Sequence, residues 1–231
     1  HMWMGGVMKH LTNLAIAAGV FIFTKLYADA ISFNSIELSG VNLVSHLLVM
    51  CFVIQWIAYI PAFLLKTEKF YDLTGSLTYI GTVLFALYAT GSFQSLQLGN
   101  LIVGMAIIVW AARLGSFLFM RIRKDKKDGR FDSIKTSFSQ FFMTWTLQGM
   151  WVFICSSAAF ISIANPTGVV INSVFIIGLL IFILYLSLVF WIIILILLKN
   201  YKLLLNVMSR NYLSIGLFIF LTSWLCIISW N

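Results

Sequence analysis

The chain has 231 residues, of which 61% are hydrophobic and only 10% are charged, and its mean hydropathy is +1.01. About a quarter of the residues of a soluble domain are charged, because its surface faces water. This composition excludes a soluble enzyme, a secreted disulfide scaffold and a disordered tail, and it indicates an integral membrane protein. Two prolines and no sustained alternation of polar and apolar residues favour long helices over a β-barrel.

Seven apolar stretches are long enough to cross a bilayer, because a helix needs about 20 largely apolar residues to span roughly 30 Å of hydrocarbon. In chain order, the predicted spans are 11–31, 41–65, 73–91, 99–120, 138–162, 169–198 and 211–230. The first is the weakest, since it carries Lys25 and Asp29. We therefore expect an all-α, polytopic transmembrane bundle of about seven spans, forming a single integral membrane domain over residues 1–231.

The loops between these spans alternate in charge. Lysines and arginines precede the first span and follow the second, fourth and sixth, whereas loops 32–40, 92–98 and 163–168 contain none. Basic loops mark the cytoplasmic side of a membrane protein. The pattern predicts a cytoplasmic N-terminus, and it argues against a nucleic-acid partner despite the net charge of +8, because the basic residues sit in short loops between spans.

Polar groups at membrane depth are costly, so each one is a candidate site residue. Gln55 lies near the middle of the second span with Tyr59 one turn later, and Arg113 lies about two turns inside the fourth. Gln148 lies near the middle of the fifth span, where helical spacing puts it on one face with Thr144, Trp151 and Cys155. For the glutamines the alternative is an interhelical hydrogen bond, and for Arg113 it is a side chain that reaches the interface.

Two further sets of residues have open interpretations. The loop 121–135 is rich in arginine and lysine, and it either marks topology and contacts lipid headgroups or binds a phosphate-bearing ligand. Trp110, Trp145 and Trp151 either line an apolar substrate cavity or serve as packing and interface anchors. No metal site is expected, because the three histidines have no carboxylate or cysteine partner nearby in the sequence.

Three stretches carry a resemblance to a known family: IPAFLLKTEKFYDLTGS at 60–76, WAARLGSFLFMR at 110–121 followed by KDGRFD at 127–132, and WTLQGMW at 145–151. Over about residues 45–165, the chain resembles the bacterial membrane proteins of unknown function grouped with the steroid 5-alpha-reductases. The resemblance implies an NADPH-dependent reductase of a C=C bond conjugated to a ketone in a steroid or other lipid. It also implies a bacterial inner membrane, a cofactor that enters from the cytoplasm and a hydrophobic substrate that enters from the bilayer.

The resemblance also implies roles for particular residues. Gln55 and Tyr59 are the candidate catalytic pair, and Trp110, Trp145 and Trp151 are candidates for substrate binding. The candidate cofactor-binding residues are Arg113, Arg121, Asp128, Arg130 and Gln148. Hydride addition to an enone leaves negative charge on the ketone oxygen, which a nearby donor stabilises, while the nicotinamide supplies the hydride.

The C-terminal region departs from this family pattern. Family members carry Ser-Arg-His-Pro-Asn-Tyr-x-Gly-Glu after a Gly-Leu-aromatic segment, but here Gly216-Leu217-Phe218 is followed by Leu221-Thr222-Ser223. No histidine follows His46 and no acidic residue follows Asp132. We therefore expect residues 185–231 to be divergent, and the alternative function is an inactive or truncated member of the same fold that binds lipid or a partner helix.

Overall fold

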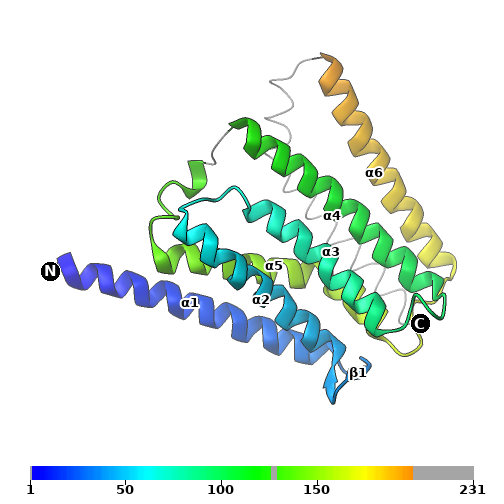
Figure 1. Ribbon diagram of the computed structural model, residues 1–231. Helices are drawn as coiled ribbons and strands as arrows, with labels where there is room; N and C mark the ends of the chain where they lie inside the picture. The colour runs from blue at the N-terminus through cyan, green and yellow to red at the C-terminus, as the bar shows by residue number, and fades with distance from the viewer. Residues whose placement is uncertain (1, 126–128, 200–231) are drawn as a thin grey trace.

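The computed structural model describes residues 2–125 and 129–199, and the regular secondary structure of this part of the chain is helical apart from one short hairpin (Figure 1). The α-helices are α1 (Met2–Ile31), α2 (Leu43–Leu64), α3 (Tyr71–Ala89), α4 (Leu98–Asp125), α5 (Phe138–Ala164) and α6 (Ser173–Lys199). Strands β1 (Glu37–Leu38) and β2 (Val41–Asn42) pair between α1 and α2, and the 3-10 turn η1 (Gly129–Phe131) precedes α5. The all-α fold class is confirmed for the described residues.

Four helices are long and apolar enough to cross a membrane: Val7–Ile31, Leu43–Leu64, Leu98–Arg123 and Phe138–Ala164. They coincide with the first, second, fourth and fifth spans expected from the sequence. The agreement follows from the local nature of the signal, because length and composition alone decide whether a helix can cross a bilayer. The chain is therefore consistent with an integral membrane protein.

The count of about seven spans is not confirmed. Helix α3 covers most of the predicted span 73–91, but it is not among the candidate spans. In α6 side chains are described only over Ser173–Leu188, and this apolar part alone is shorter than a full crossing. The predicted span 211–230 lies outside the described residues.

Helix α3 buries polar side chains on the face that it turns to its neighbours. It packs against α2, α4 and α5, and Figure 1 shows it beside α4 along most of its length. Thr78 and Thr82 are fully buried, and each hydroxyl donates to the carbonyl four residues earlier at 2.7 Å. A helix that faces protein instead of lipid can carry hydroxyls satisfied in this way.

A tight hairpin connects α1 to α2 at the end of the bundle away from the basic loops. Ser39 and Gly40 both have positive φ, which is the backbone of a two-residue hairpin turn that follows the twist of the strands. Asn42 caps α2 by accepting a hydrogen bond from the Ser45 amide at 2.8 Å. The Ile36 amide donates to the Ala164 carbonyl at 2.8 Å, so the hairpin is held against the end of α5.

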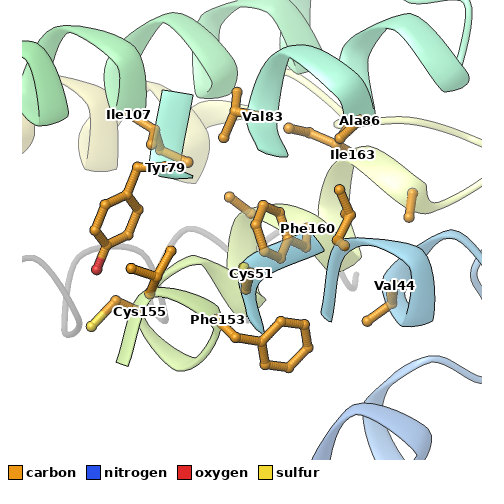
Figure 2. Close-up of a cluster of buried hydrophobic side chains, with 14 of the residues drawn as sticks. Val44, Cys51, Tyr79, Val83, Ala86, Ile107, Phe153, Cys155, Phe160 and Ile163 are labelled. Carbon is orange, nitrogen blue, oxygen red and sulfur yellow. The ribbon is translucent and has the colours of Figure 1, made fainter. Parts of the chain in front are cut away.

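Two clusters of buried side chains hold the helices together. The larger one lies between α2, α3, α4 and α5 and contains Cys51, Val83, Phe153 and Phe160 at its centre (Figure 2). The smaller one consists of Tyr59, Ala62, Phe131, Phe141 and Trp145, near the loops that carry the basic residues. Dispersion contacts of this kind are the main source of helix association where the surroundings are as apolar as the side chains.

Candidate functional site

A cavity of about 350 Å³ lies between α3, α4 and α5. This volume is near the lower end of the roughly 300–1,000 Å³ that is usual for ligand pockets. Its lining is largely apolar and aromatic, with a few polar groups: Tyr71, Asp72, Gly75, Ser76, Tyr79, Trp110, Leu114, Leu118, Leu147, Gln148, Met150, Trp151 and Val152. It runs from the middle of these helices toward the end of α4, so it lies on the side of the basic loops.

Close helix approach shapes this cavity at two glycines. A Cβ on Gly75 would collide with the amide nitrogen of Gln148 on α5, and a Cβ on Gly115 would lie 2.6 Å from the Ser76 side chain. Any larger residue at either position would push one helix away or displace its neighbour's side chain. The two glycines therefore set the width of the space between α3 and its neighbours.

Hydrogen bonds fix the polar groups at the loop end of the cavity. Gln148 Nε2 donates to the Tyr71 carbonyl at 3.1 Å, and the Tyr71 hydroxyl donates to the Thr144 carbonyl at 3.1 Å. A carbonyl can only accept, so this bond sets the orientation of the Gln148 amide. Gln148 Oε1 is buried and accepts no hydrogen bond from the described residues.

Asp72 brings the only ionised group into the described lining. Its Oδ2 atom lies 3.7 Å from Nη2 of Arg121 near the end of α4, and the two side chains are 28% and 20% exposed. Both side chains are therefore partly shielded from solvent, which strengthens the attraction between them.

The inner end of the cavity is aromatic. The rings of Tyr79 and Trp110 meet edge to face with centroids 5.1 Å apart, and Trp110 is only 2% exposed. Figure 2 shows the Tyr79 hydroxyl directed toward the side of Cys155. Trp151 on α5 is 43% exposed, so it lies where the cavity meets the outside of the described bundle.

The structure brings some of the predicted site residues together. Gln148, Trp110 and Trp151 all line the cavity, and Arg121 adjoins it through Asp72. Arg113 precedes the lining residue Leu114 in the chain but does not itself line the cavity; it is half buried, and its Nε has no hydrogen-bond partner among the described residues.

Three other predicted residues do not line the cavity. Gln55 is fully buried and donates to the Thr78 hydroxyl at 2.8 Å, which is the interhelical hydrogen bond considered as its alternative role. Tyr59 donates to the Phe138 carbonyl at 3.1 Å, and Trp145 is enclosed in the same small cluster. Gln55 therefore belongs to the contact between α2 and α3, and Tyr59 and Trp145 belong to the packing between α2 and α5.

The predicted cofactor residues of the basic loop cannot be placed in the same way. Asp128 lies outside the described residues, and the structure describes the backbone of Arg130 but not its side chain. The proposed roles of both residues remain predictions from the resemblance.

The sequence reasoning missed the contribution of α3. Tyr71, Asp72, Gly75, Ser76 and Tyr79 line the cavity, and their spacing of one helical turn puts them on one face. The first four belong to the stretch at 60–76 that carries the family resemblance. That overlap, together with the spacing, was the signal that could have identified them.

A second ion pair ties together the two loops at this end of the bundle. Lys135 Nζ donates to Glu68 Oε2 at 2.8 Å, and the Glu68 side chain is only 3% exposed. Lys135 also lies 3.5 Å from Asp132, whose side chain is 47% exposed. The hydrogen bond to Glu68 is the main cause that raises the pKa of Lys135 above its ordinary value.

The described residues contain no group of three or more histidine, cysteine, aspartate or glutamate side chains that could hold a metal ion. The described lining of the cavity is mostly apolar and has a small number of polar groups. Its chemistry rests on amide, hydroxyl, indole and carboxylate groups.

Comparison with known proteins places the chain in a family. No curated protein and no solved structure matches it. The model of one family, described as "Protein of unknown function (DUF1295)", matches residues 56–220. The match contains all three stretches on which the family resemblance was based, and it extends beyond residue 165 into the region expected to be divergent. The chain belongs to the DUF1295 family of proteins of unknown function.

Proposed function

We propose that this protein is a membrane-embedded, NADPH-dependent reductase of a C=C bond conjugated to a ketone in a steroid or other lipid. The lipid occupies the cavity between α3, α4 and α5. The proposal includes the finer topology expected from the sequence: about seven spans, a cytoplasmic N-terminus and a bacterial inner membrane.

One observation carries the proposal. The three stretches that resemble the steroid 5-alpha-reductase group, at 60–76, 110–121 and 145–151, are far apart in the sequence, yet they converge on one cavity. Among the lining residues, only Tyr79 and Val152 fall outside these stretches. If the three stretches were similar to the family only because membrane helices have similar compositions, we would not expect them to line one cavity of ligand size.

The lining suggests how the reaction would be assisted. Hydride addition to an enone leaves negative charge on the ketone oxygen, and a donor placed there lowers the barrier. The indole N–H of Trp110 and the hydroxyl of Tyr79 are donor groups at the inner end of the cavity. In this proposal they take the polarising role first expected of Gln55 and Tyr59, whose side chains are engaged in packing between helices.

The basic residues beside the cavity fit the phosphates of NADPH better than the lining does. Among the described residues the lining contains no lysine or arginine, whereas Arg121 adjoins it and Arg113 has a buried Nε without a partner in the same part of the chain. Such a nitrogen fits a phosphate oxygen, so Arg113 and Arg121 would hold the phosphates, with Asp128 and Arg130 as further contacts. When bound, NADPH would supply the hydride.

A non-catalytic lipid-binding protein of the same fold is the second candidate. It is favoured by the absence of basic residues from the described lining and by the Leu-Thr-Ser segment at 221–223, where reductases carry Arg-His-Pro-Asn. Both candidates use the cavity for lipid. They differ only in whether a hydride reaches that lipid.

Transfer of deuterium tests the first candidate. The purified protein is incubated with NADPH carrying two deuterium atoms at C4 and a 4-en-3-one steroid such as testosterone, and the product is analysed by mass spectrometry. The proposal predicts a reduced steroid that carries one deuterium. Leu118→Trp, which fills part of the cavity, should lower the yield at least tenfold.

Met120→Trp is the matched control, because Met120 is 62% exposed on the same helix and does not line the cavity. It should leave the yield within twofold of the wild type. Binding of the steroid without any deuterium transfer would reject the reductase and support the lipid-binding protein. Equal losses in both variants would reject the cavity as the reaction site.

A further inference from the structure

We propose that the cavity selects a neutral lipid that carries a hydroxyl group, which it holds at its loop end by hydrogen bonds to Asp72 and Gln148, and that it excludes lipids with an anionic head. The inference rests on the proposed function only in taking this cavity as the ligand site. It narrows the substrate to a hydroxylated lipid and sets its orientation.

Hydrogen bonding makes the loop end of the cavity rich in acceptors. The Tyr71 hydroxyl gives its proton to the Thr144 carbonyl at 3.1 Å, and the Ser76 hydroxyl gives its proton to the Asp72 carbonyl at 3.2 Å. Each hydroxyl oxygen therefore offers lone pairs and no further hydrogen. Both hydroxyl groups at this end therefore donate to protein carbonyls and are not available as donors to a ligand.

Gln148 adds an acceptor of fixed orientation. Its Nε2 donates to the Tyr71 carbonyl at 3.1 Å, so Oε1 is the amide atom left without a partner among the described residues. A buried acceptor that lacks a hydrogen bond is costly, and a ligand O–H removes that cost. A ligand that can only accept gains nothing at this atom.

The negative charge of the lining also favours a hydroxyl over an anionic head group. Asp72 is the one acidic residue in the described lining, which contains no lysine or arginine. Arg121 lies 3.7 Å from the Asp72 carboxylate and is not part of the lining, so a head group in the cavity meets the carboxylate first. A carboxylate, sulfate or phosphate head would face a like charge in a partly buried site, whereas a hydroxyl can donate to that charge.

These acceptors also determine which way a lipid enone would lie. Its ketone oxygen only accepts, so it has no favourable place among Asp72, Ser76 and Gln148. The ketone belongs at the inner end, where Trp110 and Tyr79 line the cavity. The hydroxyl then points toward the basic loops and the apolar body fills the space between them.

Three probes of equal length test this selectivity without any cofactor: 12-doxyl-octadecanol, its methyl ether and its sulfate ester. The doxyl group quenches tryptophan fluorescence, and Trp110 and Trp151 in the lining report its entry. Quenching that the Trp110→Phe/Trp151→Phe variant lacks is assigned to the cavity. We expect the alcohol to bind at least fivefold more tightly than the ether and at least tenfold more tightly than the sulfate.

Substitutions separate the two parts of the inference. Asp72→Asn removes the charge and should improve sulfate binding at least fivefold, while Gln148→Leu should remove most of the preference for alcohol over ether. Asp132→Asn is the matched control, since this aspartate lies in the neighbouring loop, is 47% exposed and does not line the cavity. It should leave all three affinities within twofold, and thermal melting should verify that each variant is folded.

Equal affinities of the wild type for alcohol, ether and sulfate would overturn the inference, as would a preference that survives both Asp72→Asn and Gln148→Leu. Absence of assigned quenching by every probe would overturn it too. The deuterium-transfer assay is independent of these outcomes, because it measures reduction of a steroid and not head-group preference. If the protein transfers deuterium but shows no head-group selectivity, the reductase proposal is retained and the inference is rejected. If it shows head-group selectivity but transfers no deuterium, the results support the lipid-binding protein.

Discussion

Lys135→Met tests how firmly the loops beside the cavity are held. Lys135 lies just before α5, and its ammonium group is 2.8 Å from the carboxylate of Glu68, just before α3. The Glu68 side chain is 3% exposed and that of Lys135 is 19% exposed, so both charges are largely removed from water. The substitution keeps most of the aliphatic stem and removes the charge.

The expected loss of stability follows from this burial. Removing one partner of a buried ion pair costs roughly 3–5 kcal/mol, because the remaining charge stays desolvated. Glu68 has further interactions and Lys135 retains some exposure, so we expect a smaller loss, about 2 kcal/mol, which is typical of a hydrogen bond between charged groups. In the double variant Glu68→Gln/Lys135→Met the two losses should be less than additive, because both substitutions remove the same hydrogen bond.

Equilibrium unfolding by dodecyl sulfate in mixed micelles, followed by tryptophan fluorescence, measures these differences. Asp132→Asn provides the control, because it breaks the longer contact of 3.5 Å to Lys135 at a side chain that is 47% exposed. Exposed pairs of this kind contribute about 0–1 kcal/mol. If Lys135→Met cost no more than Asp132→Asn, the pair with Glu68 would not hold the loops together.

The pH dependence of this difference has a definite sign. The hydrogen bond to Glu68 raises the pKa of Lys135, so the folded state favours the charged lysine more than the unfolded state does. The contribution is fully present below the ordinary lysine pKa of about 10.4 and is lost as the pH rises through the higher folded-state pKa. The gap between wild type and Lys135→Met should therefore stay constant from neutral pH to about 10 and close above it, and a gap that closes below pH 9 would contradict the assignment.

Three further substitutions probe the interior. Gln55→Leu loses one hydrogen bond to Thr78 and should cost about 1 kcal/mol in the same unfolding assay, with lipid binding unchanged because Gln55 lies outside the cavity. Asn100→Ala removes a fully buried amide that makes four hydrogen bonds near one end of the bundle, so a loss of about 2–3 kcal/mol is expected. Gly75→Ala places a methyl group against the flexible end of Gln148, so it should change unfolding by less than about 1 kcal/mol yet reduce the preference for the alcohol probe in the quenching assay.

Hydropathy predicted the membrane helices well where the signal is local. The spans expected at 41–65 and 138–162 correspond to candidate spans at Leu43–Leu64 and Phe138–Ala164. It failed to distinguish α3 from the others, because α3 owes its stability at depth to neighbours that cover Thr78 and Thr82. A hydropathy average over consecutive residues carries no information about which other helices surround a segment, because that depends on the tertiary structure.

The candidate site was predictable only in part for the same reason. Helical periodicity correctly put Gln148 and Trp151 on one face of α5, and both line the cavity. Periodicity alone could not show that Gln55 faces Thr78 or that Tyr59 donates to Phe138, since those contacts depend on how two helices are aligned. An aspartate in the first turn of a helix, such as Asp72, is also common at helix starts, so its place in the cavity had no separate local signal.

A membrane-spanning bundle requires that the bilayer separate the two sets of loops. Ser95, between α3 and α4, and Ser133, between α4 and α5, are both exposed and make a matched pair for single Ser→Cys substitutions. A membrane-impermeant maleimide applied to intact bacteria, with the parent chain as background, should label Ser95→Cys at once and Ser133→Cys only after lysis. Labelling of both variants in intact cells, or of neither before lysis, would put the two loops in one compartment and contradict the membrane-spanning arrangement on which the lipid cavity depends.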